Sequence, residues 1–191
     1  MEGHTIIALT TPLSRQDVEV LRVGDRVSLS GAIYTARDAA HKRMVEAIRK
    51  GEAPPIELDG QVIYFAGPSP ARPGRPTGSI GPTTSYRMDA FSPVLIEKGL
   101  RGMIGKGSRG ALVKEAMQRY GCVYFGATGG AAAAIAKAVR KLEVIAYDDL
   151  GPEAVRRLVV EDFAVVVIND MCGGDLYEEG QRAFREDTAG I

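Results

Sequence analysis

The stretch Gly81-Pro-Thr-Thr-Ser-Tyr-Arg-Met-Asp89 decides how the rest of the chain is interpreted, because it places hydroxyl, cationic and acidic side chains around a rigid turn. Thr83 and Thr84 directly follow the proline, and Arg87 lies four residues after Thr83. The planar guanidinium of an arginine can bind a carboxylate through two parallel hydrogen bonds. Asp89 is expected to pair with an arginine or to cap the turn.

The two threonines have two interpretations. In one, a hydroxyl caps a helix that starts after the proline. In the other, a hydroxyl is held rigidly near Arg87 and takes part in proton transfer. An ordinary threonine is a poor base, so the second interpretation requires cations or a metal ion that lower the pKa of the hydroxyl.

Upstream of this stretch, an amphipathic helix is predicted over 38–50, where apolar residues recur at helical spacing before a glycine. The spacing Thr35-Ala-Arg-Asp38 is that of a capping box and places Arg37 at the helix entrance. Asp38 is interpreted as an acid of the first helical turn. His41 shares a helix face with Arg37, either as a buried histidine with satisfied hydrogen bonds or as a support of that arginine.

Downstream, Lys106 lies between two glycines in Gly105-Lys-Gly-Ser-Arg-Gly110. The spacing matches a dinucleotide-binding loop, but the acidic residue needed about 20 positions later is missing, and Leu100 and Gly107 exclude a P-loop. A lysine before a helix N-terminus still suits a small anion, with a solvated lysine as the alternative. Three cations at three loop–helix junctions could together bind a dicarboxylate.

Composition excludes several classes of protein. The 191 residues carry 24 basic and 24 acidic side chains, which argues against a basic nucleic-acid-binding surface. The two cysteines lack metal-binding spacing and fit reduced thiols of the cytoplasm. The longest apolar run, 131–136, is far too short to cross a membrane.

Along the chain, the N-terminal part is predicted to form strands, and strands and helices alternate after it. This order indicates a single mixed α/β domain over residues 1–191. The predicted strands cover 4–9, 26–29, 32–35, 61–66, 100–104, 122–125, 144–147 and 164–168. Further helices are predicted over 92–99, 108–120 and 131–142. Residues 67–81 are expected to form a long loop or arm, and residues 126–130 a tight loop. The polar tail from Gly173 is expected to be partly disordered.

The 81–89 stretch carries a resemblance to a known family. Through it, the chain resembles the β subunit of class I, iron–sulfur-dependent fumarate hydratases and of L-tartrate dehydratase. In single-chain members of that family the same unit is the C-terminal domain. Further matching segments follow in the expected order over nearly the whole chain. They are residues 35–43, 104–107, 124–131 and 160–163. The string Gly-Pro-Thr-Thr-x-x-Arg-Met-Asp is specific, whereas the glycine segments alone are not.

The resemblance implies a swivelling β/β/α domain of the α/β class, related to a domain of aconitase. It implies reversible hydration of fumarate to (S)-malate in a complex with an α subunit, within a higher-order oligomer. The three cysteines that hold the [4Fe–4S] cluster belong to the α subunit, so this chain is expected to bind no metal. L-Tartrate is the alternative substrate, and a non-catalytic anion-binding regulatory domain is the alternative function.

The resemblance also implies roles for individual residues. Arg37, Arg87 and Lys106 would bind the carboxylates and hydroxyl of the substrate, and Thr83 would act in proton transfer with an acidic partner from the α subunit. The supporting residues would be His41, Asp38, Thr84 and Asp89. Tyr86 departs from the family pattern, in which a small residue is more usual, and could change substrate choice by crowding the pocket.

Overall fold

The computed structural model describes residues 5–127 and 132–188. Within them, seven strands form one sheet in the order β1-β2-β3-β4-β5-β7-β6. The strands are β1 (Ile7–Thr11), β2 (Arg26–Thr35), β3 (Val62–Tyr64), β4 (Gly102–Gly105), β5 (Val123–Gly126), β6 (Val139–Ala146) and β7 (Val155–Asn169). The first five strands run parallel to one another, and β7 runs antiparallel to its partners β2, β5 and β6.

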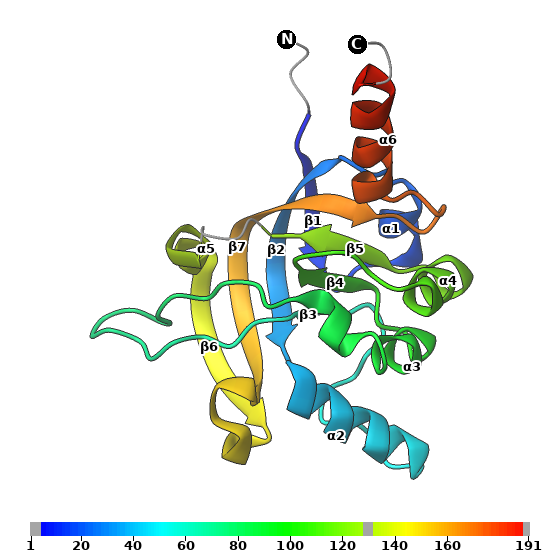
Figure 1. The fold of residues 1–191 in the computed structure, drawn as a ribbon. Helices are drawn as coiled ribbons and strands as arrows, with labels where there is room; N and C mark the ends of the chain where they lie inside the picture. The colour runs from blue at the N-terminus through cyan, green and yellow to red at the C-terminus, as the bar shows by residue number, and fades with distance from the viewer. Residues whose placement is uncertain (1–4, 128–131, 189–191) are drawn as a thin grey trace.

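The sheet closes on itself through β7. This long strand pairs with β5 near its end and with β2 along most of its length. The strands β2, β3, β4, β5 and β7 therefore form a closed circuit of hydrogen-bonded neighbours, visible in Figure 1. Gly31 marks an irregularity in the β2–β7 register, and a Cβ there would lie 2.6 Å from the Thr11 hydroxyl oxygen.

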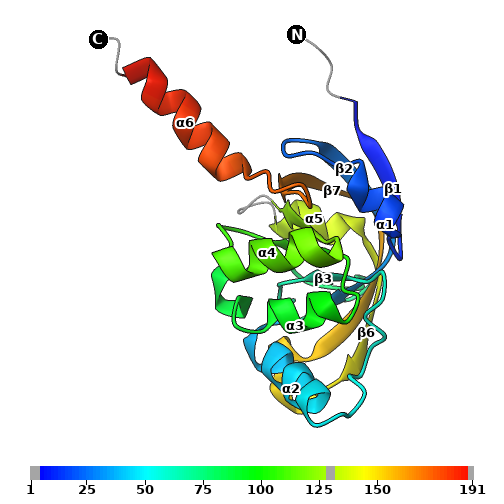
Figure 2. The same ribbon diagram turned by 90° about the vertical axis from the view of Figure 1, so that its right-hand side faces the viewer.

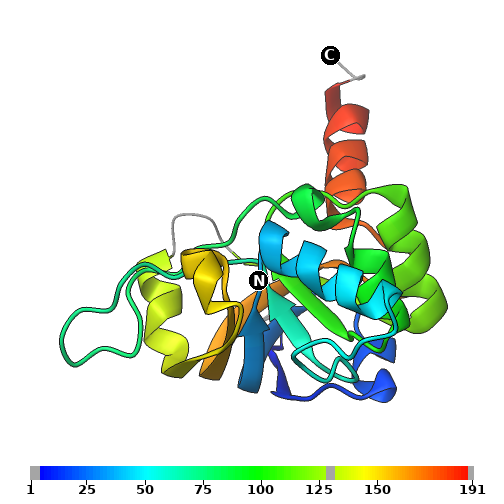
Figure 3. The same cartoon turned by 90° about the horizontal axis from the view of Figure 1, so that it is seen from below.

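Helices line one side of this sheet. The helices α2 (Asp38–Arg49), α3 (Ser92–Glu97) and α4 (Ala111–Tyr120) lie side by side along it in Figures 1 and 3. Side chains of a strand alternate between the two faces of a sheet. In β3 and the residue after it, Val62 and Tyr64 join the core cluster inside the circuit, while Ile63 and Phe65 join the one beneath the helices. The sheet thus separates two apolar cores.

The remaining helical elements lie at the margins. They are α1 (Arg15–Glu19), η1 (Ser85–Met88), α5 (Ala132–Ala138), η2 (Asp148–Glu153) and α6 (Leu176–Thr188). Figure 2 shows α6 projecting away from the body of the protein.

Two predictions of secondary structure are wrong. The helix expected over 131–142 is helical only to Ala138, because Val139 begins a strand that pairs with β7. The expected disorder after Gly173 is also wrong, since α6 occupies most of that segment. Its start is capped by Asp175, whose Oδ1 accepts hydrogen bonds from the amides of Tyr177 and Glu178. The predicted tight loop over 126–130 lies largely outside the described residues.

Candidate functional site

The candidate site lies at the carboxyl ends of β2, β3 and β4, which share one edge because neighbouring strands are parallel. Arg37 follows β2 by two residues, Phe65 follows β3 directly, and Lys106 follows β4 directly. The amide of Thr83 donates to the carbonyl of Phe65 at 2.7 Å, which brings the 81–89 stretch to the same edge. In parallel α/β sheets, both open and closed, ligands commonly bind at the carboxyl ends of the strands.

Two of the predicted cations share one carboxylate. The Nε of Arg87 lies 2.7 Å from Asp38 Oδ1, and the Nε of Arg37 lies 3.9 Å from Asp38 Oδ2. The Arg37 side chain is 23% exposed and the Arg87 side chain 41% exposed. Asp38 therefore holds two arginines from distant parts of the sequence together while both remain accessible from solvent.

Glu153 is a site residue that no sequence pattern indicated. Its Oε1 lies 3.3 Å from Arg37 Nη2, and its Oε2 accepts a hydrogen bond from the amide of Ala39 at 3.0 Å. A carboxylate is favourable at a helix N-terminus, so Glu153 caps α2 from the tip of the β6–β7 hairpin. The predicted capping box is wrong: the N-cap residue is Arg37, and the Thr35 hydroxyl has no hydrogen-bond partner among the described residues.

The third cation joins the site through its backbone. Lys106 and Thr84 form a parallel bridge, and the amide of Ser85 donates to the carbonyl of Lys106 at 2.9 Å. Thr84 is the N-cap residue of η1, but its side chain makes no capping hydrogen bond. The capping interpretation is therefore wrong for Thr84. Lys106 is exposed, and its backbone lies beside that of Thr84.

Asp89 pairs with an arginine, which confirms one of the two alternatives drawn from its position, and it caps the helix α4 rather than the turn of the 81–89 stretch. Its Oδ1 lies 2.7 Å from the Nε of Arg109, and its Oδ2 accepts a hydrogen bond from the amide of Gly110 at 2.7 Å. Gly110 is the N-cap residue of α4, so the predicted helix start at Ser108 is wrong. The carboxylate that caps this helix comes from the 81–89 stretch.

His41 is fully buried behind Arg37. Its Nδ1 donates to the carbonyl of Arg37 at 2.9 Å, and its ring packs edge-on against Phe65 with centroids 5.3 Å apart. The pKa of His41 is lowered to about 4, chiefly by burial and also by the nearby charge of Arg109, while the hydrogen bond to Arg37 and the charge of Asp38 oppose the shift. The imidazole is thus neutral at pH 7 and contacts Arg37 from within the core.

Unpaired polar atoms gather at this place. Among the described residues, buried side-chain atoms without a hydrogen-bond partner include four from residues 35–41. They are Thr35 Oγ1, Arg37 Nε, Asp38 Oδ2 and His41 Nε2. Buried polar groups are ordinarily paired, and exceptions mark places where a ligand, water or partner completes the bonding.

The described residues contain no group of three histidine, cysteine or acidic side chains that could hold a metal ion. Cys122 is buried and Cys172 is exposed, and both are free thiols. Burial raises the pKa of Cys122 to about 12, so this thiol stays protonated in the core. No helix in the described ranges has the length and apolarity to cross a membrane.

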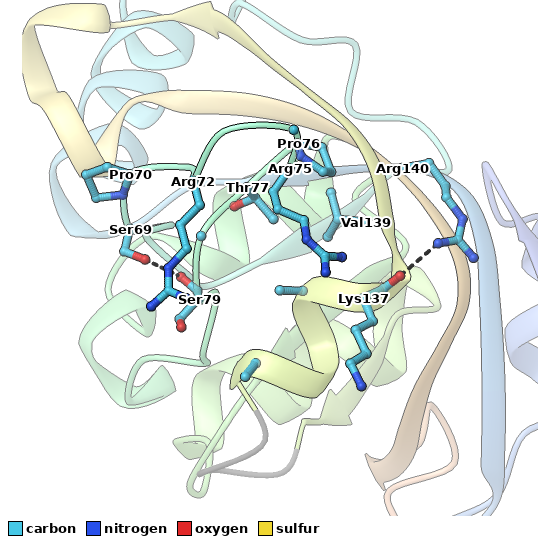
Figure 4. Close-up of a pocket in the computed structure, with 14 residues that line it drawn as sticks. Ser69, Pro70, Arg72, Arg75, Pro76, Thr77, Ser79, Lys137, Val139 and Arg140 are labelled. Carbon is cyan, nitrogen blue, oxygen red and sulfur yellow. Dashed lines mark hydrogen bonds between the residues drawn. The ribbon is translucent and has the colours of Figure 1, made fainter.

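The loop over 67–81 forms an arm with internal hydrogen bonds. The amide of Ser69 donates to the carbonyl of Ser79 at 3.0 Å, and the amide of Gly78 donates back to the carbonyl of Ser69 at 3.2 Å. Between the arm and α5 lies a cavity of about 500 Å³, drawn in Figure 4, with Arg72, Arg75 and Lys137 in its lining. The arm leaves the sheet beside Arg37, whose Nη1 would lie 3.3 Å from a Cβ at Gly67.

Comparisons with known proteins agree with the resemblance. A family model described as "Fumarase C-terminus" matches residues 2–180. The chain is 39% identical over 180 residues to fumarate hydratase 1, mitochondrial, of Leishmania major, covering 90% of this chain and 33% of that protein. It is 37% identical over 180 residues to the anaerobic class I fumarate hydratase of Escherichia coli K12, with 90% and 33% covered.

A third relative is a separate subunit. The putative L(+)-tartrate dehydratase subunit beta of Methanocaldococcus jannaschii is 39% identical over 180 residues, which cover 91% of this chain and 92% of that protein. The chain spans about a third of the length of the curated fumarate hydratases that it matches. Because the family model covers most of the chain and this relative matches nearly end to end, the chain belongs to the fumarase C-terminus family.

Proposed function

We propose that this chain is the β subunit of a heteromeric hydro-lyase that reversibly hydrates fumarate to (S)-malate. The observation that carries the proposal is that Arg37 and Arg87 share the carboxylate of Asp38, while the backbone of Lys106 pairs with that of Thr84, next to Thr83, at the same edge of the sheet. A dicarboxylate has two charges to neutralise, and this edge offers three cations. Membership of the fumarase C-terminus family supports the same reaction class.

The reaction gives each of these residues a task. In the dehydration direction, a proton leaves the carbon beside a carboxylate, and negative charge develops on that carboxylate. Arg37 and Arg87 would bind and stabilise it, because each guanidinium can offer a planar pair of donors. Thr83 would accept the proton together with an acidic group of the partner subunit, and Lys106 would bind the hydroxyl or the second carboxylate.

The residues of this chain do not fit an iron–sulfur cluster, since the described part offers no suitable group of ligands. The proposal therefore assigns the [4Fe–4S] cluster to an α subunit. The end-to-end match with a protein named as a subunit supports a division between two chains. The closed circuit of strands with helices along one side supports a swivelling β/β/α domain over residues 1–191. The two free thiols support the cytoplasm as its compartment.

L-Tartrate is the second candidate substrate, because the relative of matching length carries that name. Fumarate is favoured by the names of the longer relatives. L-Tartrate differs from malate by one hydroxyl, so a single polar contact could decide between them. Tyr86 is 66% exposed beside Arg87, at a position from which it could face a substrate or partner surface.

The test is anaerobic reconstitution with the product of a neighbouring gene that encodes a longer chain with three well-separated cysteines. We expect the pair to convert fumarate to malate and the separate chains to be inactive. Turnover of L-tartrate at a much higher kcat/KM than malate would transfer the assignment to the tartrate enzyme. A stable pair that turns over neither substrate would favour the non-catalytic anion-binding domain.

A further inference from the structure

Two buried hydrogen-bonded contacts join the 81–89 stretch to the 105–110 loop, and these segments carry Arg87 and Lys106. The first is the ion pair of Asp89 with Arg109, and the second is a relay from Ser85 through Tyr124 to Gly107. We propose that these contacts position the cations of the site before substrate or partner binds, and that Tyr124 is a positioning residue for Lys106. The inference rests on the proposed function and adds residues that touch no substrate.

Arg109 is a charge held inside the protein. Its side chain is 0% exposed and lies between the rings of Phe65 and Tyr124, whose centroids are 5.2 and 5.1 Å from its Cζ. Besides Asp89, its guanidinium donates to the hydroxyl oxygen of Ser92 at 2.7 Å and to the sulfur of Met103 at 3.2 Å. A buried charge is tolerated only with such partners, so this arrangement specifies one geometry.

The Asp89–Arg109 pair sets the relative position of the two segments. Asp89 lies two residues after Arg87, and Arg109 lies three residues after Lys106. The second oxygen of Asp89 accepts a hydrogen bond from the amide of Gly110, so two short contacts hold the two segments together. A shift of either segment would leave a buried guanidinium without its counter-charge, which is strongly unfavourable.

The relay through Tyr124 acts closer to Lys106. The hydroxyl of Tyr124 donates to the carbonyl of Gly107 at 2.8 Å, so the hydroxyl of Ser85 supplies the proton of the 2.8 Å bond between Ser85 and Tyr124. Burial raises the pKa of Tyr124 well above its ordinary value, which keeps the proton available for donation. The amide of Ser85 also binds the carbonyl of Lys106.

The residues around the relay are tightly packed. A Cβ at Gly105 would collide with the Ser85 side chain, so the loop can approach this closely only with glycine at that position. Lys106 is thereby fixed on both sides, by Ser85 at its own carbonyl and by Tyr124 at the next one. Misplacement by about 1 Å can cost roughly 10²-fold in rate, so such fixing is relevant to substrate binding.

The test is Tyr124→Phe in the reconstituted enzyme, with Thr11→Val as the matched control. Each variant deletes one buried hydroxyl that donates to a backbone carbonyl, and Thr11 bonds Ala32 at 2.6 Å in the β1–β2 region. Both variants should show a similar, small fall in the melting temperature. We expect the KM for the dicarboxylate to rise about 10-fold in Tyr124→Phe, with a smaller change in kcat, and to stay at the wild-type value in Thr11→Val.

The variant Ser85→Ala is the second measurement, because it breaks the same relay from its other end. If the relay acts as a unit, Ser85→Ala should raise KM, and the double variant with Tyr124→Phe should raise it no further than the larger single effect. Unchanged KM in both single variants would overturn the inference. An inactive wild-type pair would instead refute the proposed function, so the two failures are distinguishable.

Discussion

At the scale of single residues, Arg87 and Thr83 allow binding to be separated from proton transfer. In Arg87→Lys the charge remains, but the planar fork and the 2.7 Å contact of Nε with Asp38 are lost. We expect kcat/KM of the reconstituted enzyme to fall at least about 10-fold and the melting temperature of the subunit to change little. Steady-state kinetics with thermal melts check this. Wild-type kcat/KM in this variant would remove Arg87 from the site.

Thr83→Ala deletes the proposed proton acceptor while the cations stay in place. If Thr83 has that role, kcat should fall by roughly 10²–10⁴ with a much smaller change in KM. Thr84→Ala is the matched control, because its hydroxyl makes no capping hydrogen bond in the structure. This control should keep both its kcat and its stability. Equal, mild losses in the two variants would leave Thr83 as a turn residue.

The burial of His41 leads to a prediction about how the stability of the subunit depends on pH. Its pKa is about 4 in the folded chain and about 6.5 when unfolded, so the unfolded chain takes up the proton first as the pH falls. The stabilisation by the neutral ring is complete above pH 6.5 and is lost as the pH falls toward 4. Between pH 7 and pH 5 the unfolding free energy should drop by about 2 kcal/mol.

Urea unfolding of the subunit at several pH values measures this drop. His41→Gln cannot titrate, so the difference between wild type and variant isolates the contribution of His41 from that of the carboxylates. Arg109 and Asp38 are the charged groups whose fields reach the ring, and they act in opposite directions. Parallel pH profiles for the two proteins would show that the pKa of His41 is the same in the folded and the unfolded chain, which would contradict its burial as a neutral ring.

At the scale of elements, a helix or strand could be predicted where its own residues determine its conformation, and not where pairing with a distant segment determines it. The helix α2 was predicted almost to its ends, because its apolar residues repeat at helical spacing. The strand β6 was mistaken in part for helix, because only its pairing with β7 decides its state. The helix α6 was missed although Asp175 and Glu178 stand at the spacing of a capping box.

The site was predictable to a similar extent. Recognisable sequence motifs contain Arg37, Thr83, Arg87 and Lys106. The structure brings these motifs to one edge of the sheet. Arg109 lies within a glycine-rich motif and was not predicted as a site residue, because only the fold shows that its side chain is buried. Glu153 had no local pattern at all, since it caps a helix whose start is 114 residues away.

The contact of Glu153 with α2 gives a prediction at this scale. Glu153→Ala removes both the helix cap and the partner of Arg37, so the unfolding free energy should fall by about 1 kcal/mol. Glu161→Ala is the control, because Glu161 pairs with Arg140 at 2.7 Å on an exposed surface, where ion pairs contribute little. Chemical denaturation of both variants compares them. Equal losses would mean that Glu153 does not join the hairpin to the helix.

At the scale of the whole molecule, the proposed function makes this chain one half of an active site. The cations lie on a solvent-facing edge, several buried polar atoms around Arg37 lack partners, and the described residues offer no cluster ligands. The two cores share one closed circuit of strands, so they should unfold together. We therefore expect the purified chain to unfold in a single transition, to contain no iron or sulfide, and to be inactive alone.

Calorimetry, metal analysis and a fumarate assay of the lone chain check these three expectations. The melting temperature of this chain should then rise with the concentration of the partner, roughly as the logarithm of that concentration, because binding to the folded state alone stabilises it. The Arg37→Ala variant should keep the single transition, since this side chain makes its ion pairs at the margin of the fold. Turnover by the chain without a partner, or iron and sulfide bound to it in stoichiometric amounts, would refute the division of the site between two subunits.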